Sequence, residues 1–294
     1  MRPGHVLLAV LVAAVWGFNF VVIHVGISQF PPLLFSALRF TVASIPLVFF
    51  VRKPDISWRI LLSIGLVLGV VKFSLLFVGM DKGVSAGLAS LVLQSQAFFT
   101  AVLAWLVFKD KPRPIQVLGI LLAFGGIGLI ASTVDQSITP IGLSLVLAAG
   151  FAWAVSNLLM KLAGQVDMLS LIVWVSLIPP LPLLILSMFL EGPGAAAKAF
   201  SNLNGLGIGA IAYIAFAATI LGFGLWGKLI RHYGASRVAP FSLLVPVFGM
   251  SFSALLLGEN FGPVRLIAAI LIIGGLILTV VRLPKTFAAA NSRV

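Results

Sequence analysis

The chain has 294 residues, of which 61% are hydrophobic and only 9% are charged, and its mean hydropathy is +1.20. This composition excludes a soluble domain and predicts a polytopic membrane protein. The net charge of +12 does not indicate a nucleic-acid partner, because the basic residues lie in short segments between apolar runs. The absence of cysteine excludes disulfides, thiolate metal sites and cysteine nucleophiles.

Ten apolar runs follow one another, each long enough to cross a bilayer as a helix at about 1.5 Å rise per residue. The first run is too long for a signal-peptide core and lacks a cleavage pattern, so it is expected to stay as a spanning helix. Short turns separate the runs, which predicts one bundle without a soluble domain. The runs are 5–27, 31–51, 58–80, 85–108, 113–132, 139–163, 168–190, 206–229, 238–258 and 263–282.

Two cations lie inside the early runs, Arg39 in the second and Lys72 in the third. A charge in hydrocarbon costs about 3 kcal/mol on insertion scales, so both are expected to face the interior or a wet cavity. No Asp or Glu lies in the centre of a run to pair with them. The pair is therefore a candidate anchor for a substrate carboxylate. In the alternative, Arg39 caps carbonyls of a broken helix and Lys72 snorkels outward.

The fourth run carries two glutamines, Gln94 and Gln96, near its middle. In a regular helix they point about 200° apart, so only one is expected to face a cavity. The other would make a hydrogen bond between helices, and the sequence does not choose between them. Phe99 shares a face with Gln96 and is a further candidate for substrate contact.

Mid-helix aromatic and amide residues are candidates for the wall of a binding pocket, because a buried tryptophan needs a partner for its N–H. Bundle packing is the alternative for each. Trp58, Trp174 and Trp226 lie nearer the ends of their runs and are expected to anchor at the membrane interface. The candidates are Trp16 and Asn19 in the first run, Trp153 with Ser156 or Asn157 in the sixth, and Tyr213 in the eighth.

The ninth run has Ser242, Pro246 and Gly249 on one face. Pro246 removes an amide and frees the Ser242 carbonyl, which is tolerable beside protein or a cavity. Ser242 is a candidate substrate contact, and Pro246 with Gly249 is a candidate hinge; a static kink is the alternative.

The distribution of basic residues predicts the orientation of the chain. Of the 19 Lys and Arg, three lie on the outer side and 14 on the cytoplasmic side when the chain begins inside. The positive-inside rule therefore places both termini in the cytoplasm. The outer cations are Lys82, Lys198 and Arg265, and the inner ones are Arg2, Arg52, Lys53, Arg59, Lys109, Lys111, Arg113, Lys161, Lys228, Arg231, Arg237, Arg282, Lys285 and Arg293.

The two halves of the chain resemble each other. Trp16 aligns with Trp153 at an offset of 137, and Asp110 aligns with Glu259 at an offset of 149. Each half has five runs, and an odd number reverses the second half relative to the first. The sequence thus predicts an all-α integral membrane fold of ten transmembrane helices, built as two inverted five-helix repeats over residues 1–136 and 137–294. This architecture is typical of secondary transporters with a site near the midplane, although a non-transporting scaffold could also arise by duplication.

Enzyme chemistry is not indicated. The three histidines lie near the ends of runs, and there is no HExxH, no pair of intramembrane aspartates and no Walker sequence. We therefore expect no enzyme activity, no metal and no cofactor.

Residues 16–21, 37–40, 87–99 and 237–259 carry a family resemblance. With these stretches the chain resembles the EamA-type branch of the drug/metabolite transporter superfamily, in particular bacterial exporters of aromatic amino acids or of O-acetylserine and cysteine. The similarity covers essentially the whole chain. It departs at Asp110, where the repeat usually ends in Glu, and at Ala97, where a proline is common. The resemblance implies efflux of small metabolites across the bacterial inner membrane.

The expected function is export of amino acids and related small amphipathic metabolites by alternating access. No mid-membrane carboxylate is available for a proton relay, so a facilitated carrier is favoured. The alternatives are a broad drug or metabolite exporter coupled to protons and a non-transporting scaffold. The expected partners are a small-molecule substrate and the lipid bilayer, and the oligomeric state is left open.

Overall fold

Helices form all the regular structure that the computed structural model describes, which covers residues 1–133 and 138–280 without the side chains of Ser236 and Val280. Apart from helices, this part contains an isolated bridge between Val84 and Ile138. Eight helices are long and apolar enough to cross a membrane. They are Pro3–Gln29, Trp58–Asp81, Ala86–Phe108, Pro114–Ala131, Pro140–Leu162, Met168–Leu190, Gly205–Tyr233 and Ala239–Leu257, with two shorter apolar helices, Pro32–Val48 and Pro263–Thr279.

The first half of the chain forms seven α-helices and one π-helical segment. They are α1 (Pro3–Gln29), α2 (Pro32–Val48), α3 (Trp58–Ile64), η1 (Gly65–Lys72), α4 (Phe73–Asp81), α5 (Ala86–Val92), α6 (Ser95–Phe108) and α7 (Pro114–Ala131).

The second half begins with α8 (Pro140–Leu162), α9 (Met168–Ser176), α10 (Pro180–Leu190) and α11 (Pro193–Ser201). It continues with α12 (Gly205–Ala212), η2 (Tyr213–Leu221), α13 (Gly222–Tyr233), α14 (Ala235–Val238), η3 (Ala239–Leu243), α15 (Leu244–Leu257) and α16 (Pro263–Val280). The helix α11, in a segment expected to be a short turn, was not predicted. Arg282, Lys285 and Arg293, together with the end of the tenth run, lie outside the described residues.

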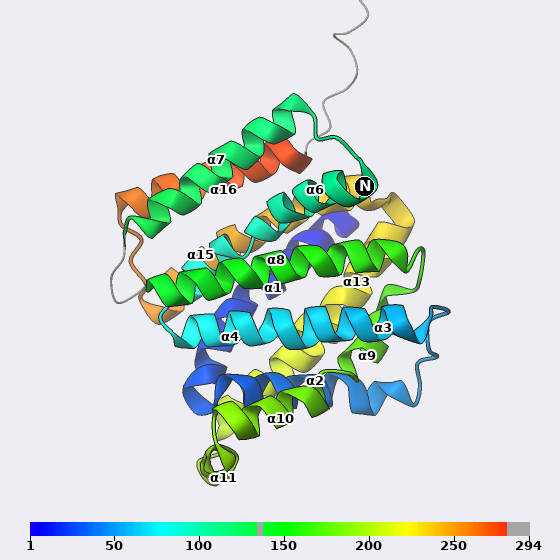
Figure 1. Cartoon of the computed structure of the whole chain (residues 1–294), viewed down its shortest axis with the longest axis vertical. Helices are drawn as coiled ribbons and strands as arrows, with labels where there is room; N and C mark the ends of the chain where they lie inside the picture. The colour runs from blue at the N-terminus through cyan, green and yellow to red at the C-terminus, as the bar shows by residue number, and fades with distance from the viewer. Residues whose placement is uncertain (134–137, 281–294) are drawn as a thin grey trace, which may run out of the picture.

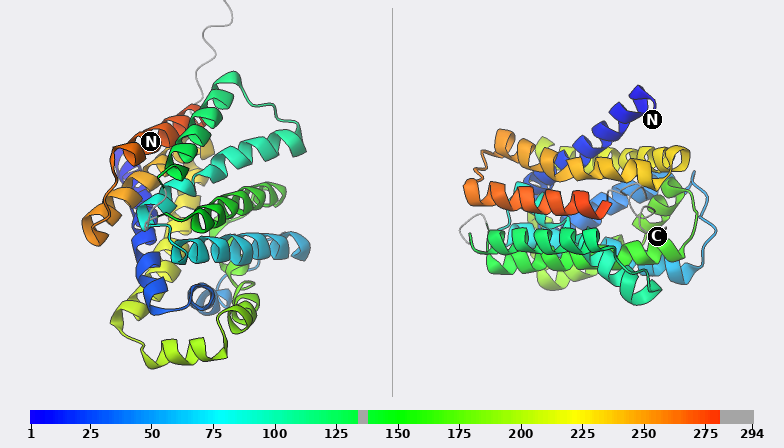
Figure 2. Two further views of the ribbon diagram at one scale, coloured as in Figure 1. Left: turned by 60° about the vertical axis from the view of Figure 1, so that its left-hand side comes forward. Right: turned by 90° about the horizontal axis from the view of Figure 1, so that it is seen from above.

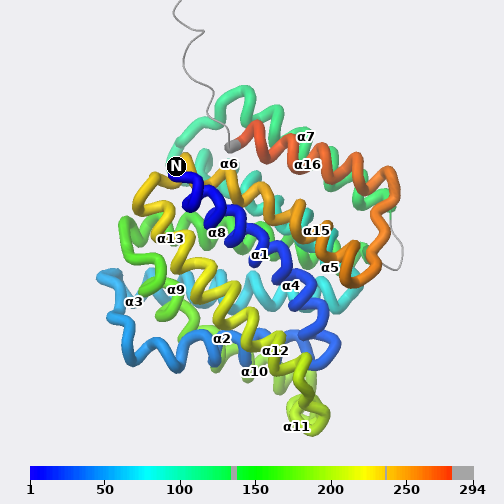
Figure 3. The backbone as a smooth tube through the Cα atoms, turned by 180° about the vertical axis from the view of Figure 1, so that it is seen from behind, coloured from blue at the N-terminus to red at the C-terminus, as the bar shows by residue number. Residues whose placement is uncertain are grey.

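The helices lie side by side in one bundle, with the α7–α16 pair at one edge and α11 at the opposite edge (Figures 1 and 2). Figure 3 shows α1 crossing the bundle diagonally, next to α13 and α15. Glycines allow the closest crossings. A Cβ on Gly119 would lie 2.6 Å from the Gly275 carbonyl oxygen, and one on Gly17 would lie 2.9 Å from the Val245 oxygen. These pairs join elements from the two halves of the chain.

Several membrane helices are interrupted near their middle. The third helix of each half passes through a π-helical segment, η1 and then η2. Within η2, Thr219 donates its hydroxyl proton to the Ile214 carbonyl oxygen at 2.8 Å. The helix from 85 to 108 turns at Leu93 and Gln94, and the one after 238 begins as the 3-10 segment η3. Interruptions of this kind often mark functional sites, because they free backbone groups and redirect side chains.

Two glutamates fasten helix N-termini at one end of the bundle. The Glu259 carboxylate accepts hydrogen bonds from the Ala86 N–H at 2.7 Å and the Gly87 N–H at 3.0 Å, and from the Ser85 hydroxyl at 2.9 Å. Glu191 accepts from the N–H groups of Leu33 and Leu34 at the start of α2. A carboxylate is favourable there because the first turn of a helix has unpaired N–H donors and a positive dipole end.

Candidate functional site: a central cavity

A cavity of about 420 Å³ lies between the two halves of the chain. Its lining residues come from α1, α2, η1, α4, the α5–α6 turn and the start of α6 in the first half of the chain, and from α8, α9, η2, α13, η3 and α15 in the second half. The lining reaches Met168 at the start of α9, Ile230 in the last turn of α13 and Ala239 at the start of η3. Figure 3 shows that the start of α9 and the end of α13 lie at the end of the bundle opposite the α15–α16 connection, which holds Glu259. The cavity therefore extends from mid-bundle toward the end opposite Glu259.

The two cations meet at one aromatic ring. The Arg39 guanidinium carbon lies 3.8 Å from the centroid of Phe73, and the Lys72 ammonium nitrogen lies 3.4 Å from the same centroid. Arg39 also lies 4.1 Å from Phe40, and Lys72 lies 4.6 Å from Trp153. Both cations are buried and line the cavity. Lys72 does not snorkel outward, and Arg39 makes no hydrogen bond to a carbonyl within the described ranges.

Rings stabilise these charges only in part, since a cation–π contact contributes about 0.5–2 kcal/mol. No Asp or Glu lines the cavity in the part of the chain that the structure describes. Within that part, neither cation makes an ion pair or a hydrogen bond. Two buried like charges beside an open space are an arrangement that an anionic ligand group would complete.

The opposite wall is aromatic. Trp16 donates its indole N–H to the Ala218 carbonyl oxygen at 2.9 Å, and its ring lies 5.1 Å from Trp226 and 5.2 Å from Phe223. Trp226 is only 8% exposed and lines the cavity, so its expected role as an interface anchor was wrong. That expectation rested on the position of Trp226 near the end of its apolar run, but the cavity extends to this end of the bundle. Trp58 is exposed and packs against Trp174, which donates to the Val51 carbonyl.

Gln94 and Gln96 both line the cavity, which corrects the expectation that only one faces it. The expectation assumed a regular helix. The chain instead turns at Leu93 and Gln94 and restarts as α6 at Ser95, so the 200° separation does not hold. Both glutamines therefore border the same cavity.

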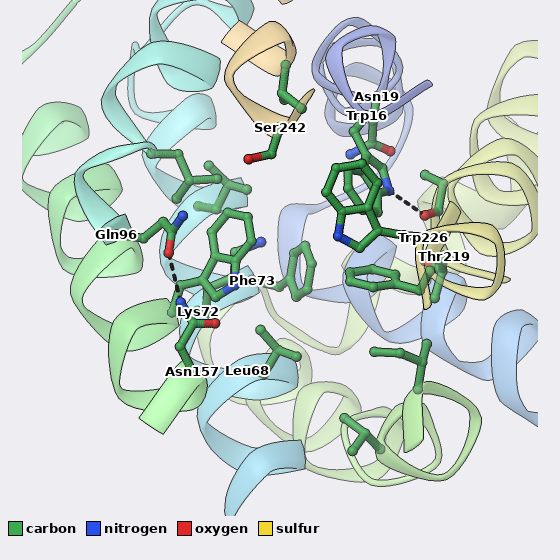
Figure 4. A pocket seen from close by; sticks show the side chains of 18 of the residues that line it. Trp16, Asn19, Leu68, Lys72, Phe73, Gln96, Asn157, Thr219, Trp226 and Ser242 are labelled. Carbon is green, nitrogen blue, oxygen red and sulfur yellow. Dashed lines mark hydrogen bonds between the residues drawn. The ribbon is translucent and has the colours of Figure 1, made fainter. Parts of the chain in front are cut away.

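Gln96 belongs to a hydrogen-bonded group with Asn157 and Thr100. The Asn157 amide nitrogen donates to the Gln96 side-chain oxygen at 2.8 Å and to the Thr100 hydroxyl oxygen at 3.1 Å. The Thr100 hydroxyl donates to the Gln96 backbone carbonyl at 2.6 Å. Figure 4 shows Gln96 and Asn157 side by side on the wall next to Lys72.

Most of the other candidates also line the cavity. Asn19 does so with its side-chain oxygen buried and without a hydrogen-bond partner among the described residues. Phe99 and Tyr213 do not line it. Phe99 packs against Phe124 and Phe151, and Tyr213 donates to the Val15 carbonyl at 2.9 Å. The candidates that line the cavity are Trp16, Asn19, Arg39, Lys72, Gln94, Gln96, Trp153, Asn157 and Ser242.

The proposed hinge lies at a crowded crossing. Pro246 is in the first turn of α15, just after η3, so it does not interrupt a continuous helix. A Cβ on Gly249 would lie 2.4 Å from the Ser90 hydroxyl oxygen of α5. Ser242 donates its hydroxyl to the Ala239 carbonyl. The glycine thus serves close packing, and the hinge role stays a prediction.

The sequence did not indicate some of the lining residues, because their residue types are common in membrane helices. Phe73, Phe223, Met160 and Met168 are apolar and carry no sequence signal that separates cavity from core. Thr219 could have been found, since it is a polar residue in the middle of an apolar run. Within the described residues, no group of His, Asp and Glu could hold a metal ion.

Comparison with known proteins identifies a family that matches most of the chain. The EamA-like transporter family matches residues 4–132 and again residues 140–281. A Salmonella typhimurium protein named "Probable amino-acid metabolite efflux pump" is 44% identical over 279 residues, which cover 93% of each chain. An Escherichia coli protein of the same name is 41% identical over the same share.

A more distant relative and a solved structure are also similar to most of the chain. The Bacillus subtilis "Uncharacterized transporter YoaV" is 24% identical over 91% of this chain and 93% of its own. A crystal structure that is 14% identical in sequence superposes with a TM-score of 0.67 over 95% of this chain and 96% of the other. At that identity the structure shows a shared fold alone.

Proposed function

Because the chain belongs to the EamA-like transporter family, we propose that it is an inner-membrane transporter that exports amino acids and related small amphipathic metabolites by alternating access. The observation that carries the proposal is the cavity between the halves, where Arg39 and Lys72 share the Phe73 ring without an acidic partner in the described residues. The names of the Salmonella and Escherichia coli relatives support amino-acid metabolites as substrates and efflux as the direction.

A substrate would use both walls of the cavity if its carboxylate bound Arg39 and Lys72. Its apolar or aromatic side chain would then pack against Trp16 and Trp226. Trp153 lies beside Lys72 and would contact the part of the substrate between its carboxylate and its side chain. This arrangement suits a small amphipathic acid, because one end requires charge compensation and the other excludes water.

We further propose ten membrane crossings in two inverted repeats, 1–136 and 137–294. Three observations support the repeat. The family matches each half, and the π-helical segments start at Gly65 and Tyr213, close to the 149-residue offset. The break at Gln94 has its counterpart at Leu243, where η3 passes into α15.

The cavity and the caps support alternating access. The cavity lining extends toward the end of the bundle that holds the start of α9, while Glu259 fastens α15 to α5 at the other end. Asp110, the counterpart of Glu259, makes no hydrogen bond among the described residues. With both termini in the cytoplasm, this is the cytoplasm-facing state in which an exporter loads its substrate. Exchange between the states would break the cap on one side and form one on the other.

We propose facilitated transport without proton coupling, since no carboxylate lines the cavity in the described part of the chain. The second candidate is a broad drug exporter. The aromatic wall of Trp16, Phe223 and Trp226 favours it, because stacked rings also accept flat apolar compounds.

Counterflow in proteoliposomes distinguishes these functions. Purified protein is reconstituted and loaded with unlabelled amino acids, and uptake of labelled amino acids is compared with uptake of a lipophilic cation. Saturable exchange of amino acids without exchange of the cation supports the proposal. Exchange of the cation alone indicates the drug exporter, and no exchange of either indicates a scaffold.

A further inference from the structure

The hydrogen bonds around Thr100 determine which atoms the neighbouring amides present to the cavity. A threonine hydroxyl has one proton. The 2.6 Å distance from Thr100 Oγ1 to the Gln96 backbone oxygen requires that proton, because two oxygens do not approach so closely without one. Toward Asn157 the same hydroxyl can therefore only accept.

An accepting hydroxyl orients the Asn157 side chain. The Asn157 nitrogen must face Thr100, where it lies at 3.1 Å, and its second proton goes to the Gln96 side-chain oxygen at 2.8 Å. Both protons of the Asn157 amide are thereby used. Turning this amide over would place its oxygen against two acceptors, so the orientation follows from the chemistry of the group.

The remaining atoms of the two amides are unpaired. Within the described residues, Asn157 Oδ1 and Gln96 Nε2 have no hydrogen-bond partner, and both side chains line the cavity. Figure 4 shows the Asn157 oxygen and the Gln96 nitrogen on the sides of the two amides that face away from the hydrogen bond between them. Trp153, one turn earlier on α8, contacts the Lys72 ammonium at 4.6 Å. The wall beside Lys72 thus offers an acceptor from Asn157 and a donor from Gln96.

We propose that Thr100 is a positioning residue that holds Asn157 as the acceptor for the substrate's amino group. An α-amino acid carries its ammonium and carboxylate on the same carbon. When Lys72 holds the carboxylate, the ammonium needs an acceptor close by, and no carboxylate lines the cavity in the described part. Asn157 Oδ1 supplies it. The cavity therefore selects α-amino acids over 2-oxo acids of the same skeleton, which have no donor at that position.

Thr100 itself does not line the cavity, so its effect passes through Asn157. The other hydroxyls on the wall belong to Ser176, Thr219 and Ser242, which come from other elements. Thr219 and Ser242 donate their protons to backbone carbonyls. This proposal deepens the proposed function and rests on it.

The test is competition in the counterflow assay, with labelled leucine against unlabelled leucine or 4-methyl-2-oxopentanoate. The wild type is expected to prefer leucine. Thr100→Val keeps the volume and removes the hydroxyl, so the Asn157 amide can turn its nitrogen to the cavity. The preference for leucine over the oxo acid should then fall at least about ten-fold, the scale of one hydrogen bond to a charged group. Thr100→Ser should restore it.

Thr41→Val is the matched control. Thr41 makes the same bond to a carbonyl four residues back, to Ala37 at 2.9 Å, but lies outside the cavity. It should keep the wild-type preference. Asn157→Leu removes the acceptor directly and should lose the preference even if Thr100→Val fails to fold.

A folded Asn157→Leu protein that keeps the wild-type preference overturns the inference, as does a folded Thr100→Val protein that keeps it. Failure of the proposed function gives a different result, because the wild type then exchanges neither compound.

Discussion

At Arg39 and Lys72 the chain keeps two positive charges in a membrane bundle where, among the described residues, no acid neutralises them. A protein that used these residues only for packing would be more stable with apolar side chains of similar length, since buried charges carry a desolvation cost. We propose ligand binding as the physical reason to retain them. The rings of Phe40, Phe73 and Trp153 lower that cost.

Lys72→Met retains most of the stem and removes the charge. Counterflow of free amino acids is expected to weaken by about 1.5–3 kcal/mol, the scale of a charged hydrogen bond. Amino-acid amides, which lack the carboxylate, should exchange about as well as in the wild type. Arg39→Met and the double variant belong in the same series, because Arg39 can take part of the contact. Equal effects on acid and amide would assign Lys72 to packing.

Trp153→Ala tests the aromatic wall. Its ring contacts Lys72 and lines the cavity, so its loss should reduce exchange of large apolar amino acids several-fold more than that of small ones. Trp16→Ala is expected to act in the same direction, with an added packing loss because its indole N–H bond to Ala218 disappears. Trp58→Ala, at an exposed position outside the cavity, is the control. A uniform loss across substrate sizes in the folded variants would indicate packing alone.

At the scale of helices, the interruptions distinguish this bundle from one of regular spans. The break before α6 lets two glutamines line the same cavity, and η1 ends at Lys72. Glycine crossings hold these irregular elements close together. Gly65 and Gly69 leave room for Ile178 and Pro179 at the α9–α10 turn, and Gly79 approaches the Gly142 carbonyl of α8. Tight packing therefore supports the segments that shape the cavity.

Glu259→Gln is expected to loosen the cap on α5. The neutral amide loses the charge that strengthens three hydrogen bonds of 2.7–3.0 Å. The end of the bundle near Glu259 should then open more often. The chain has no cysteine, so Leu76→Cys in the cavity wall gives one labelling site. An impermeant maleimide added from the Glu259 side should react severalfold faster in the Gln variant.

Asp110→Asn is the matched control for that experiment. Asp110 is the proposed repeat counterpart of Glu259 and makes no hydrogen bond within the described ranges. It should not accelerate labelling from the Glu259 side. An unchanged rate in Glu259→Gln would show that the cap does not govern access.

At the scale of the whole molecule, orientation can be tested without any assay of transport. Reporter fusions at Glu191, and at Asp135, which lies outside the described residues, are expected to report the outer side. Fusions at Lys111 and at the carboxyl terminus should report the cytoplasm. An odd number of crossings between the termini would exclude the inverted repeat.

Energy coupling is the second test at this scale. Because no carboxylate lines the described cavity, a pH gradient across vesicles should change amino-acid flux little beyond its effect on substrate ionisation. Substrate accumulation driven by that gradient alone would contradict the proposal of a facilitated carrier, and it would direct attention to Asp110 and Glu259.

The sequence by itself determined the membrane class, the positions of the apolar helices and the family. Nine of the eleven candidate substrate contacts also line the cavity, because polar or charged residues such as Arg39 and Asn157 stand out in apolar runs. Only the tertiary structure decided that Gln94 and Gln96 both line the cavity and that Trp226 lines it as well. The physical reason is that a helix period assumes regular backbone. A break, a π-helical segment or a neighbour from the other half of the chain redirects a side chain in ways that spacing does not show.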